Sequence, residues 1–219
     1  MKRSSNCGGK SLHIGKIVCI GRNYAEHIKE LGNETPERPI IFMKPSTAVI
    51  DNGEKIVIPS YSNDCHHEVE LALLIGKAGR SIAPKDVYSH IAGYGVAIDL
   101  TLRDVQAGLK KKGLPWEIAK GFDTSCPLSS FVPAMAIADP HDLRLVMTVN
   151  GENRQDGHTS MMIHRIPEMV SYKSSIFTLE EGDVILTGTP SGVSAIRAGD
   201  SLKAEIPGVA RIEVTVAFT

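Results

Sequence analysis

The amino-acid sequence predicts an α+β fold, a mixed β-roll or barrel with a few short helices. Three observations lead to this prediction: short apolar runs separated by Gly and Pro turns occur along the chain, helical patterns are few, and the two do not alternate as in βαβ proteins. Hydrophobic residues make up 42% of the chain and aromatic residues only 5%, so we expect an aliphatic core. No linker or repeat divides the chain, which predicts a loose N-terminal tail at 1–15 and a single domain over 16–219.

The first strand and helix are predicted within residues 16–32. "KIVCIGRNY" opens with a short apolar strand that ends in a turn. A helix follows, with Asn23 as its N-cap, Glu26 as the capping-box partner three residues later, and Gly32 as the stop. Extended segments are expected next, at "PIIFMKP" and "GEKIVIP".

The later elements follow the same rules. "AGYGVAIDLT" is an apolar strand, and Thr101 with Asp104 repeats the capping pattern at the start of the helix "LRDVQAGLKKKG". Asn150 and Gly151 are a hairpin turn signal within "LRLVMTVNGENRQDG". A further helix is predicted near 161–177, and strands are predicted within 182–190 and 199–218.

The strand "HHEVELALLIG", residues 66–76, is unusual because it carries two glutamates in an apolar run. Side chains of a strand alternate between two faces, so Val69 and the apolar residues in step with it form one continuous face. Glu68 and Glu70 share the other face with His66, and their backbones are about 6 to 7 Å apart. Taken alone, such a pair is more often a solvated face. The alternative is a pair of carboxylates that lines a site.

Charge and cysteine usage exclude some classes of function. A formal net charge of −1 gives no electrostatic signature of nucleic-acid binding. The basic start lacks the apolar region of a signal peptide, and no apolar run approaches the length of a membrane span. The adjacent Cys65, His66 and His67 are a poor zinc chelate, because neighbouring strand residues face opposite sides. Cysteines without a C-x-x-C pair fit a reducing compartment, so we expect a cytoplasmic protein; they are Cys7, Cys19, Cys65 and Cys126.

Asp99 is another acid in an unexpected place, since it ends an apolar run just before a predicted helix. Alone it is typical of a helix entry. If it converges with Glu68 and Glu70, each pair of like charges repels by about 2 to 3 kcal/mol at an effective dielectric constant near 20. Such a cluster must take up a proton or hold a cation. An all-carboxylate set favours Mg²⁺ first, then Mn²⁺ or Ca²⁺.

Further polar residues are candidates for chemistry beside such an ion. His27 and Glu30 lie three apart on the first helix, where a Glu can orient a His that acts as general base. A surface pair is the ordinary alternative. The other candidates, each of which is ordinarily a solvated charge or a turn residue, are Arg103, Gln106, Lys120 and Thr189.

Seven segments together resemble the fumarylacetoacetate hydrolase family, in particular its short members of the acylpyruvate hydrolase and oxaloacetate decarboxylase type. The resemblance extends from Lys16 onward, in family order. It rests on "GRNYAEHIKELG", "KPSTAV", "HHEVELALLIG", "IAGYGVAIDLTLRDVQ", "GLPWEIAKGFD", "VNGENRQDG" and "GDVILTGTPSGV".

The resemblance implies a fold, a cofactor and a set of site residues. The fold is the family's mixed β-roll, usually assembled as a homodimer. The family's E-x-E and later Asp hold Mg²⁺ or Mn²⁺, which carries over to Glu68, Glu70 and Asp99. Its catalytic His–Glu dyad carries over to His27 and Glu30. Positions that contact substrate match Arg103, Gln106, Lys120 and Thr189, with Lys120 also counted as catalytic.

The predicted function is a metal-dependent hydrolase that cleaves the C–C bond of small acylpyruvates, giving pyruvate and a carboxylic acid. Decarboxylation of oxaloacetate is a natural sister activity, because both reactions pass through a pyruvate enolate. No acid lies between Lys16 and Ala25, where some members add a metal ligand, so water is expected to fill that position and a small acylpyruvate is favoured over fumarylacetoacetate.

Three alternatives remain open from the sequence. The first is an isomerase or decarboxylase of 2-hydroxy-dienoates, and the second is a non-catalytic β-roll that uses the ion structurally. The third is a hydrolase that uses Cys126 or Cys65 as its nucleophile, although neither cysteine has a visible His partner.

Overall fold

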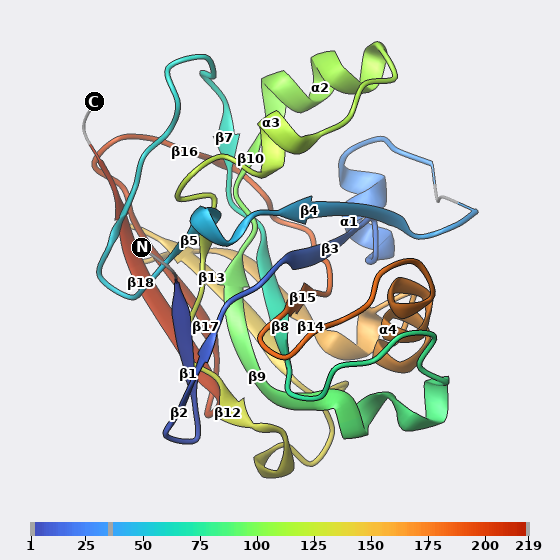
Figure 1. Ribbon diagram of the computed structural model, residues 1–219. Helices are drawn as coiled ribbons and strands as arrows, with labels where there is room; N and C mark the ends of the chain where they lie inside the picture. The colour runs from blue at the N-terminus through green and yellow to red at the C-terminus, as the bar shows by residue number, and fades with distance from the viewer. Residues whose placement is uncertain (1–2, 35–36, 218–219) are drawn as a thin grey trace.

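A computed structural model describes residues 3–34 and 37–217, and its centre is two packed β-sheets (Figure 1). The six-stranded mixed sheet has the order β12 (Val132–Pro133), β9 (Ile91–Ile98), β8 (Val69–Ile75), β15 (Val184–Leu186), β3 (Ile17–Gly21) and β4 (Ile40–Lys44). The five-stranded sheet has the order β14 (Glu152–His158), β13 (Arg144–Val149), β17 (Ser201–Ile206), β18 (Ala210–Val216) and β6 (Lys55–Ile56).

Smaller sheets and short helices surround these two layers. The smaller sheets are the pair β1 (Ser4–Cys7) and β2 (Lys10–His13), the trio β10 (Thr101–Leu102), β7 (Cys65–His66) and β16 (Ala195–Ile196), and the pair β11 (Cys126–Pro127) and β5 (Val49–Ile50). The helices are α1 (Ala25–Glu30), α2 (Arg103–Lys111), α3 (Glu117–Lys120) and α4 (Ile166–Ile176). The 3₁₀ turns are η1 (Ser46–Ala48), η2 (Pro84–His90), η3 (Ala134–Ala136) and η4 (Thr159–Met161).

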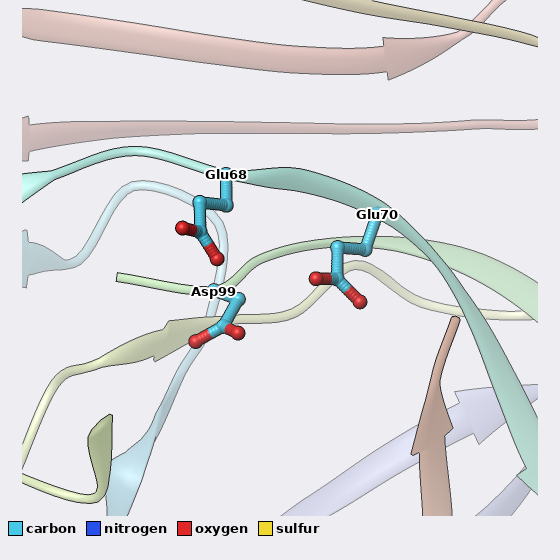
Figure 2. Close-up of side chains that lie close together, drawn as sticks. All are labelled: Glu68, Glu70 and Asp99. Atoms are coloured by element: carbon cyan, nitrogen blue, oxygen red, sulfur yellow. The ribbon is translucent and has the colours of Figure 1, made fainter. Parts of the chain in front are cut away.

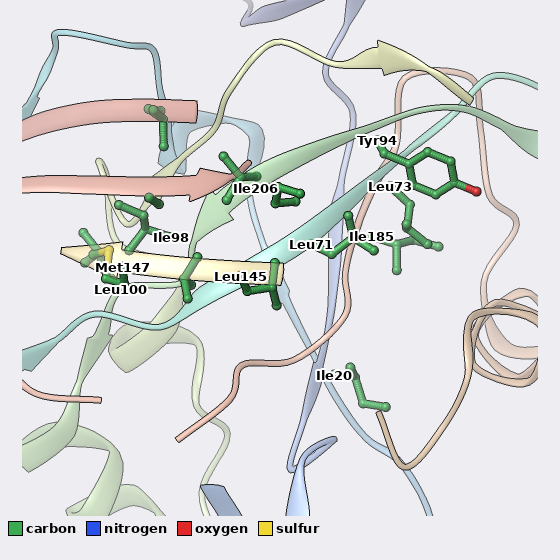
Figure 3. Close-up of a cluster of buried hydrophobic side chains, with 14 of the residues drawn as sticks. Ile20, Leu71, Leu73, Tyr94, Ile98, Leu100, Leu145, Met147, Ile185 and Ile206 are labelled. Carbon is green, nitrogen blue, oxygen red and sulfur yellow. The ribbon is translucent and has the colours of Figure 1, made fainter. Parts of the chain in front are cut away.

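The prediction of an α+β fold of mixed strands is confirmed, and the sheets remain open rather than closing into a barrel. The core lies between the two large sheets, where side chains of β8, β9 and β15 meet those of β13 and β17 (Figure 3). None of the helices in the described ranges is long and apolar enough to span a membrane.

The two-faced pattern predicted for 66–76 is present in β8. Val69 and Leu71 face the core between the sheets, as do Leu73 and Ile75 farther along the strand. The opposite face packs against a second apolar cluster through Ala72 and Leu74. The predicted single strand is interrupted, because β7 ends at His66 and β8 begins at Val69. This break places Glu68 just before β8.

Two predicted helix caps are wrong. The N-cap of α1 is Tyr24, while the Asn23 side chain donates to the carbonyls of His164 and Thr187 and accepts from the His164 N–H. The N-cap of α2 is Leu102. Thr101 lies in β10 instead, with its hydroxyl bonded to the Asp99 carbonyl. Tertiary hydrogen bonds occupy the Asn23 side chain, whereas a local bond to the backbone occupies the Thr101 hydroxyl, so neither side chain caps its helix.

The two predicted glycine-dependent turns are confirmed. Gly32 ends α1 with φ +59°, and Asn150 and Gly151, at φ +52° and +82°, join β13 to β14.

The predicted loose tail at 1–15 is wrong over residues 4–13. These residues form the β1–β2 hairpin, in which Cys7 pairs with Lys10 across Gly8 and Gly9. The hairpin is anchored to the body of the protein, because Leu12 packs in the second apolar cluster. The other tail residues, 1–2, lie outside the described part of the chain.

Candidate active site

Pairing of β8 with β9 brings the three predicted acids together. Glu70 lies opposite Ala97 in the antiparallel register, and the Asp99 N–H donates to the Glu68 carbonyl over 2.8 Å. One carboxylate oxygen from each of Glu68, Glu70 and Asp99 lies within 4.8 Å of the other two (Figure 2). The three side chains are at most 5% exposed. The solvated-face interpretation of the two glutamates is therefore wrong.

Three cationic side chains surround this acid cluster. Lys120, at the end of α3, bridges Glu68 and Asp99 with distances of 2.8 and 2.7 Å from its Nζ. Arg103 Nη2 lies 2.5 Å from Glu68 Oε1. Lys44 Nζ lies 2.9 Å from Asp99 Oδ1 as an electrostatic contact, because its hydrogen bonds go to oxygens of Leu100, Lys120 and Ser125.

Lys44 is a site residue that sequence reasoning missed. It ends the strand β4 in the segment "PIIFMKP", and it is 1% exposed. A lysine at the end of an apolar run was the available signal, but its partner is 55 residues away in sequence. Only the folded structure shows the contact.

The two glutamates have opposite electrostatic environments. Burial, the largest influence, acts to raise the pKa of Glu68, but Lys120, Arg103 and His27 together hold that pKa well below its ordinary value. Burial raises the pKa of Glu70 well above its ordinary value, and Asp99 and Glu68 raise it further. Glu70 makes no ion pair with a described residue, and its Oε2 accepts only the Gly188 N–H, over 2.6 Å.

The acid cluster fits a hard divalent ion. All three donors are carboxylates, the ligand type that Mg²⁺ and Mn²⁺ prefer. Glu70 forms no ion pair with any described residue, and Asp99 Oδ1 is buried with Lys44 Nζ at 2.9 Å but accepts no hydrogen bond from the described residues, so both carboxylates retain free oxygen lone pairs for an ion. A bound ion would offset the like-charge repulsion that otherwise favours protonation of Glu70.

The predicted His–Glu pair is present on α1. His27 Nδ1 lies 3.2 Å from Glu30 Oε2, and Glu30 Oε1 accepts the Gly192 N–H over 2.9 Å. Because both carboxylate oxygens are engaged, the ring of His27 is held in one orientation. No residue in the described ranges forms a hydrogen bond with its Nε2, which leaves this atom available for proton transfer.

A cavity of about 280 Å³ joins the dyad to the acid cluster. Its wall includes nearly all the predicted site residues, and the two that do not line it, Glu30 and Asp99, contact the lining residues His27 and Lys120. Thr189 lines the cavity, but its hydroxyl is engaged, since it donates to the Val69 carbonyl and accepts from Gln155. Sequence reasoning missed other wall residues, including Arg22, Asn33, Phe42, Lys110 and Trp116.

The cysteine alternative is not supported by the structure. Cys65 and Cys126 are buried, and burial raises the pKa of each thiol to about 12. A nucleophilic cysteine requires the thiolate, which these environments disfavour. The neighbouring His67 forms its hydrogen bonds with Gln155 and Ser194 instead.

Comparison with known proteins identifies the family. A family model described as "Fumarylacetoacetate (FAA) hydrolase C-terminal" matches residues 16–217. The chain belongs to this family. Within it, the chain is 53% identical to "Oxaloacetate tautomerase YcgM" of Escherichia coli K12, over 89% of this chain and 90% of that protein. It is 49% identical to human "Oxaloacetate tautomerase FAHD1, mitochondrial", over 88% and 87%.

Solved structures of the family have the same fold. A fumarylpyruvate hydrolase from Pseudomonas aeruginosa, in complex with Mn²⁺ and pyruvate, is 35% identical with a TM-score of 0.95, covering all of this chain and 97% of that one. A 5-carboxymethyl-2-hydroxymuconate delta-isomerase from Mycobacterium smegmatis is 36% identical with a TM-score of 0.83, covering 96% and 83%. The family relatives therefore carry the names of different reactions.

Proposed function

We propose that this chain is a divalent-metal-dependent enzyme that interconverts the keto and enol forms of oxaloacetate. The observation that carries the proposal is the placement of the His27–Glu30 dyad and a buried three-carboxylate cluster on one small cavity. The tautomerase names of relatives that are about half identical support the choice of reaction and substrate.

Glu68, Glu70 and Asp99 would hold Mg²⁺ or Mn²⁺. When bound, the ion supplies Lewis acidity at the 2-keto end of the acid, which favours loss of a proton from the neighbouring carbon. The charges of the site balance, because the three carboxylates lie beside three cationic side chains, Lys44, Lys120 and Arg103, which pair with Asp99 and Glu68. The two positive charges of the ion would then balance the two negative charges of oxaloacetate.

His27 would perform the proton transfer. Its Nε2 accepts the proton from C3 of oxaloacetate, the electron pair of that C–H bond becomes the C2–C3 double bond, and the π pair of the C2 carbonyl moves onto its oxygen. Delivery of the same proton to the C2 oxygen completes the enol, and the reverse steps regenerate the keto form. Glu30 holds the ring through Nδ1 and stabilises the imidazolium between the steps.

The cations beside the cavity would stabilise the negative charge that develops on the C2 oxygen. Lys120 is buried, and although burial opposes its charge, Asp99 and Glu68 raise its pKa above the ordinary value. It therefore stays an ammonium ion at neutral pH. Stabilisation of this kind counts most where water is excluded.

The proposed function is tested by following the approach of enol-oxaloacetate to equilibrium by ultraviolet absorbance with Mg²⁺ present. We expect His27→Asn to slow the exchange by at least about 100-fold, as for loss of a general acid–base group. The matched control is His13→Asn, an exposed histidine of β2 away from the cavity. Equal rates for the wild type and His27→Asn would contradict the proposal.

Hydrolysis of small acylpyruvates is the second candidate, favoured by the likeness to the fumarylpyruvate hydrolase structure. The dyad would then activate a water that attacks the distal carbonyl, and the C–C bond would break to release pyruvate. Assays of acetylpyruvate and fumarylpyruvate beside oxaloacetate separate the two reactions. Faster cleavage of an acylpyruvate than enol exchange of oxaloacetate would favour the second candidate.

A further inference from the structure

The mouth of the cavity carries two cations that the proposed chemistry does not use. Arg22 follows β3, and Lys110 lies near the end of α2. Both donate to the same atom, Asn33 Oδ1, with distances of 3.0 Å from Arg22 Nη2 and 2.8 Å from Lys110 Nζ. Arg22 also donates to the carbonyl of Glu34 over 3.0 Å. Three separate segments of the chain thus hold two cations together at one point.

These two cations differ from the others on the cavity wall. Arg103 and Lys120 are paired with carboxylates, whereas neither Arg22 nor Lys110 forms an ion pair with any described residue. A neutral amide oxygen alone bridges them. Partial burial lowers the pKa of Lys110, and the charges of Arg22 and Arg103 lower it further. Positive charge at the mouth is therefore unbalanced, which favours the binding of an anion.

We propose that Arg22 and Lys110, positioned by Asn33, bind the second carboxylate of a dicarboxylic 2-keto acid. This inference rests on the proposed function, in which the acid cluster and its ion take the 2-keto end of the substrate. The guanidinium and the ammonium supply several donors to one carboxylate, the pairing for which arginine is best suited. The subsite would select oxaloacetate over acids whose distal end is neutral.

The cavity also has an apolar side, which defines the competing possibility. Leu31, Phe42 and Trp116 line it, and the rings of Phe42 and Trp116 are 6.0 Å apart. An acyl chain would pack against these side chains without using the cations. Removal of a positive charge at the mouth therefore separates the two possibilities, because it should weaken binding to the subsite and leave packing of an acyl chain unchanged.

The test compares two ligands that differ only at the distal end. 2-Oxobutyrate has a methyl group where oxaloacetate has its second carboxylate. Trp116 is the single tryptophan of the chain and lines the cavity, so its fluorescence reports the binding of each acid to the Mg²⁺-loaded protein. This equilibrium reading does not depend on turnover.

We expect Lys110→Met and Arg22→Gln each to raise the Kd of oxaloacetate by about tenfold or more, as for loss of a hydrogen bond between charged groups. The Kd of 2-oxobutyrate should change by less than about twofold. Lys111→Met, an exposed neighbour on α2, is the matched control and should alter neither constant.

An equal change for both acids, no change for either, or no saturable response of Trp116 would overturn the subsite. Failure of the proposed function is distinguishable, because it would appear as absent enol exchange in the wild type while the preference for oxaloacetate in binding persists.

Discussion

Two buried lysines, Lys120 and Lys173, lie in regions that shift the pKa of an ammonium group in opposite directions. Lys120 is 3% exposed and contacts the carboxylates of Glu68 and Asp99. Lys173, on α4, is fully buried, and among the described residues its Nζ donates only to the backbone carbonyls of Val18 and Leu186, over 3.0 and 3.1 Å. The first lies in the candidate site, and the second lies where a helix packs on the six-stranded sheet.

The difference shows that the counter-charge, and not burial, decides whether such a lysine stays charged. Burial acts to lower the pKa of both ammonium groups. At Lys120 the neighbouring Asp99 and Glu68 overcome this effect and raise the pKa. At Lys173 no carboxylate of the described residues is close enough to form an ion pair, and burial lowers the pKa to about 7. Lys120 thus keeps the positive charge that the proposed reaction uses, while Lys173 makes the free energy of unfolding depend on pH.

The largest expected effect is that of Lys120→Met. In the proposed reaction the Lys120 ammonium would stabilise the charge on the C2 oxygen, so we expect its removal to lower kcat/KM for enol exchange by about 100-fold or more. It also leaves Glu68 and Asp99 short of a cation, so Tm without metal should fall and Mg²⁺ should restore part of it. Activity within about fivefold of the wild type would show that the two lysines do not differ as described.

A smaller effect is expected from Lys173→Met, on stability alone. In the unfolded chain the pKa of Lys173 is about 10.4, the ordinary value of a lysine. Between about pH 7 and about pH 10 the unfolded chain therefore binds a proton at Lys173 that the folded chain does not. The free energy of unfolding should therefore rise with pH across this window, by up to about 3 kcal/mol from this group between pH 7 and pH 9.5.

Urea denaturation at several pH values checks this dependence. Lys173→Met should flatten the rise, whereas Lys29→Met, an exposed control on α1, should leave it unchanged. Parallel curves for the wild type and Lys173→Met would mean that Lys173 keeps its proton despite its surroundings.

The parts of the fold that depend on local pattern could be predicted from the sequence. Alternation in 66–76 gave the two faces of β8, and the turn at Asn150 and Gly151 gave the β13–β14 hairpin. The same logic was available for Gly8 and Gly9, a two-residue turn between β1 and β2 that the polar composition of this segment concealed. Local signals alone do not separate a polar hairpin from a loose tail.

The parts that depend on tertiary contacts could not be predicted in this way. Asn23 has the sequence context of a helix cap, but its side chain binds groups more than 140 residues away. Lys44 and Lys110 look like ordinary lysines until the fold brings Asp99 and Asn33 to them. The acid cluster was suggested by acids within and beside apolar runs, where a charge is costly without a partner, but these positions alone also allowed a solvated face, and the family resemblance decided the prediction.

The most direct test of the account is calorimetric titration of the protein with Mn²⁺ or Mg²⁺. The account predicts one ion per chain, with affinity lowered by about 100-fold or more in Asp99→Asn and in Glu70→Gln, since each loses a charged ligand. Glu181→Gln, an exposed acid far from the cavity, should bind the ion like the wild type. Unchanged affinity in Asp99→Asn and Glu70→Gln would contradict the account.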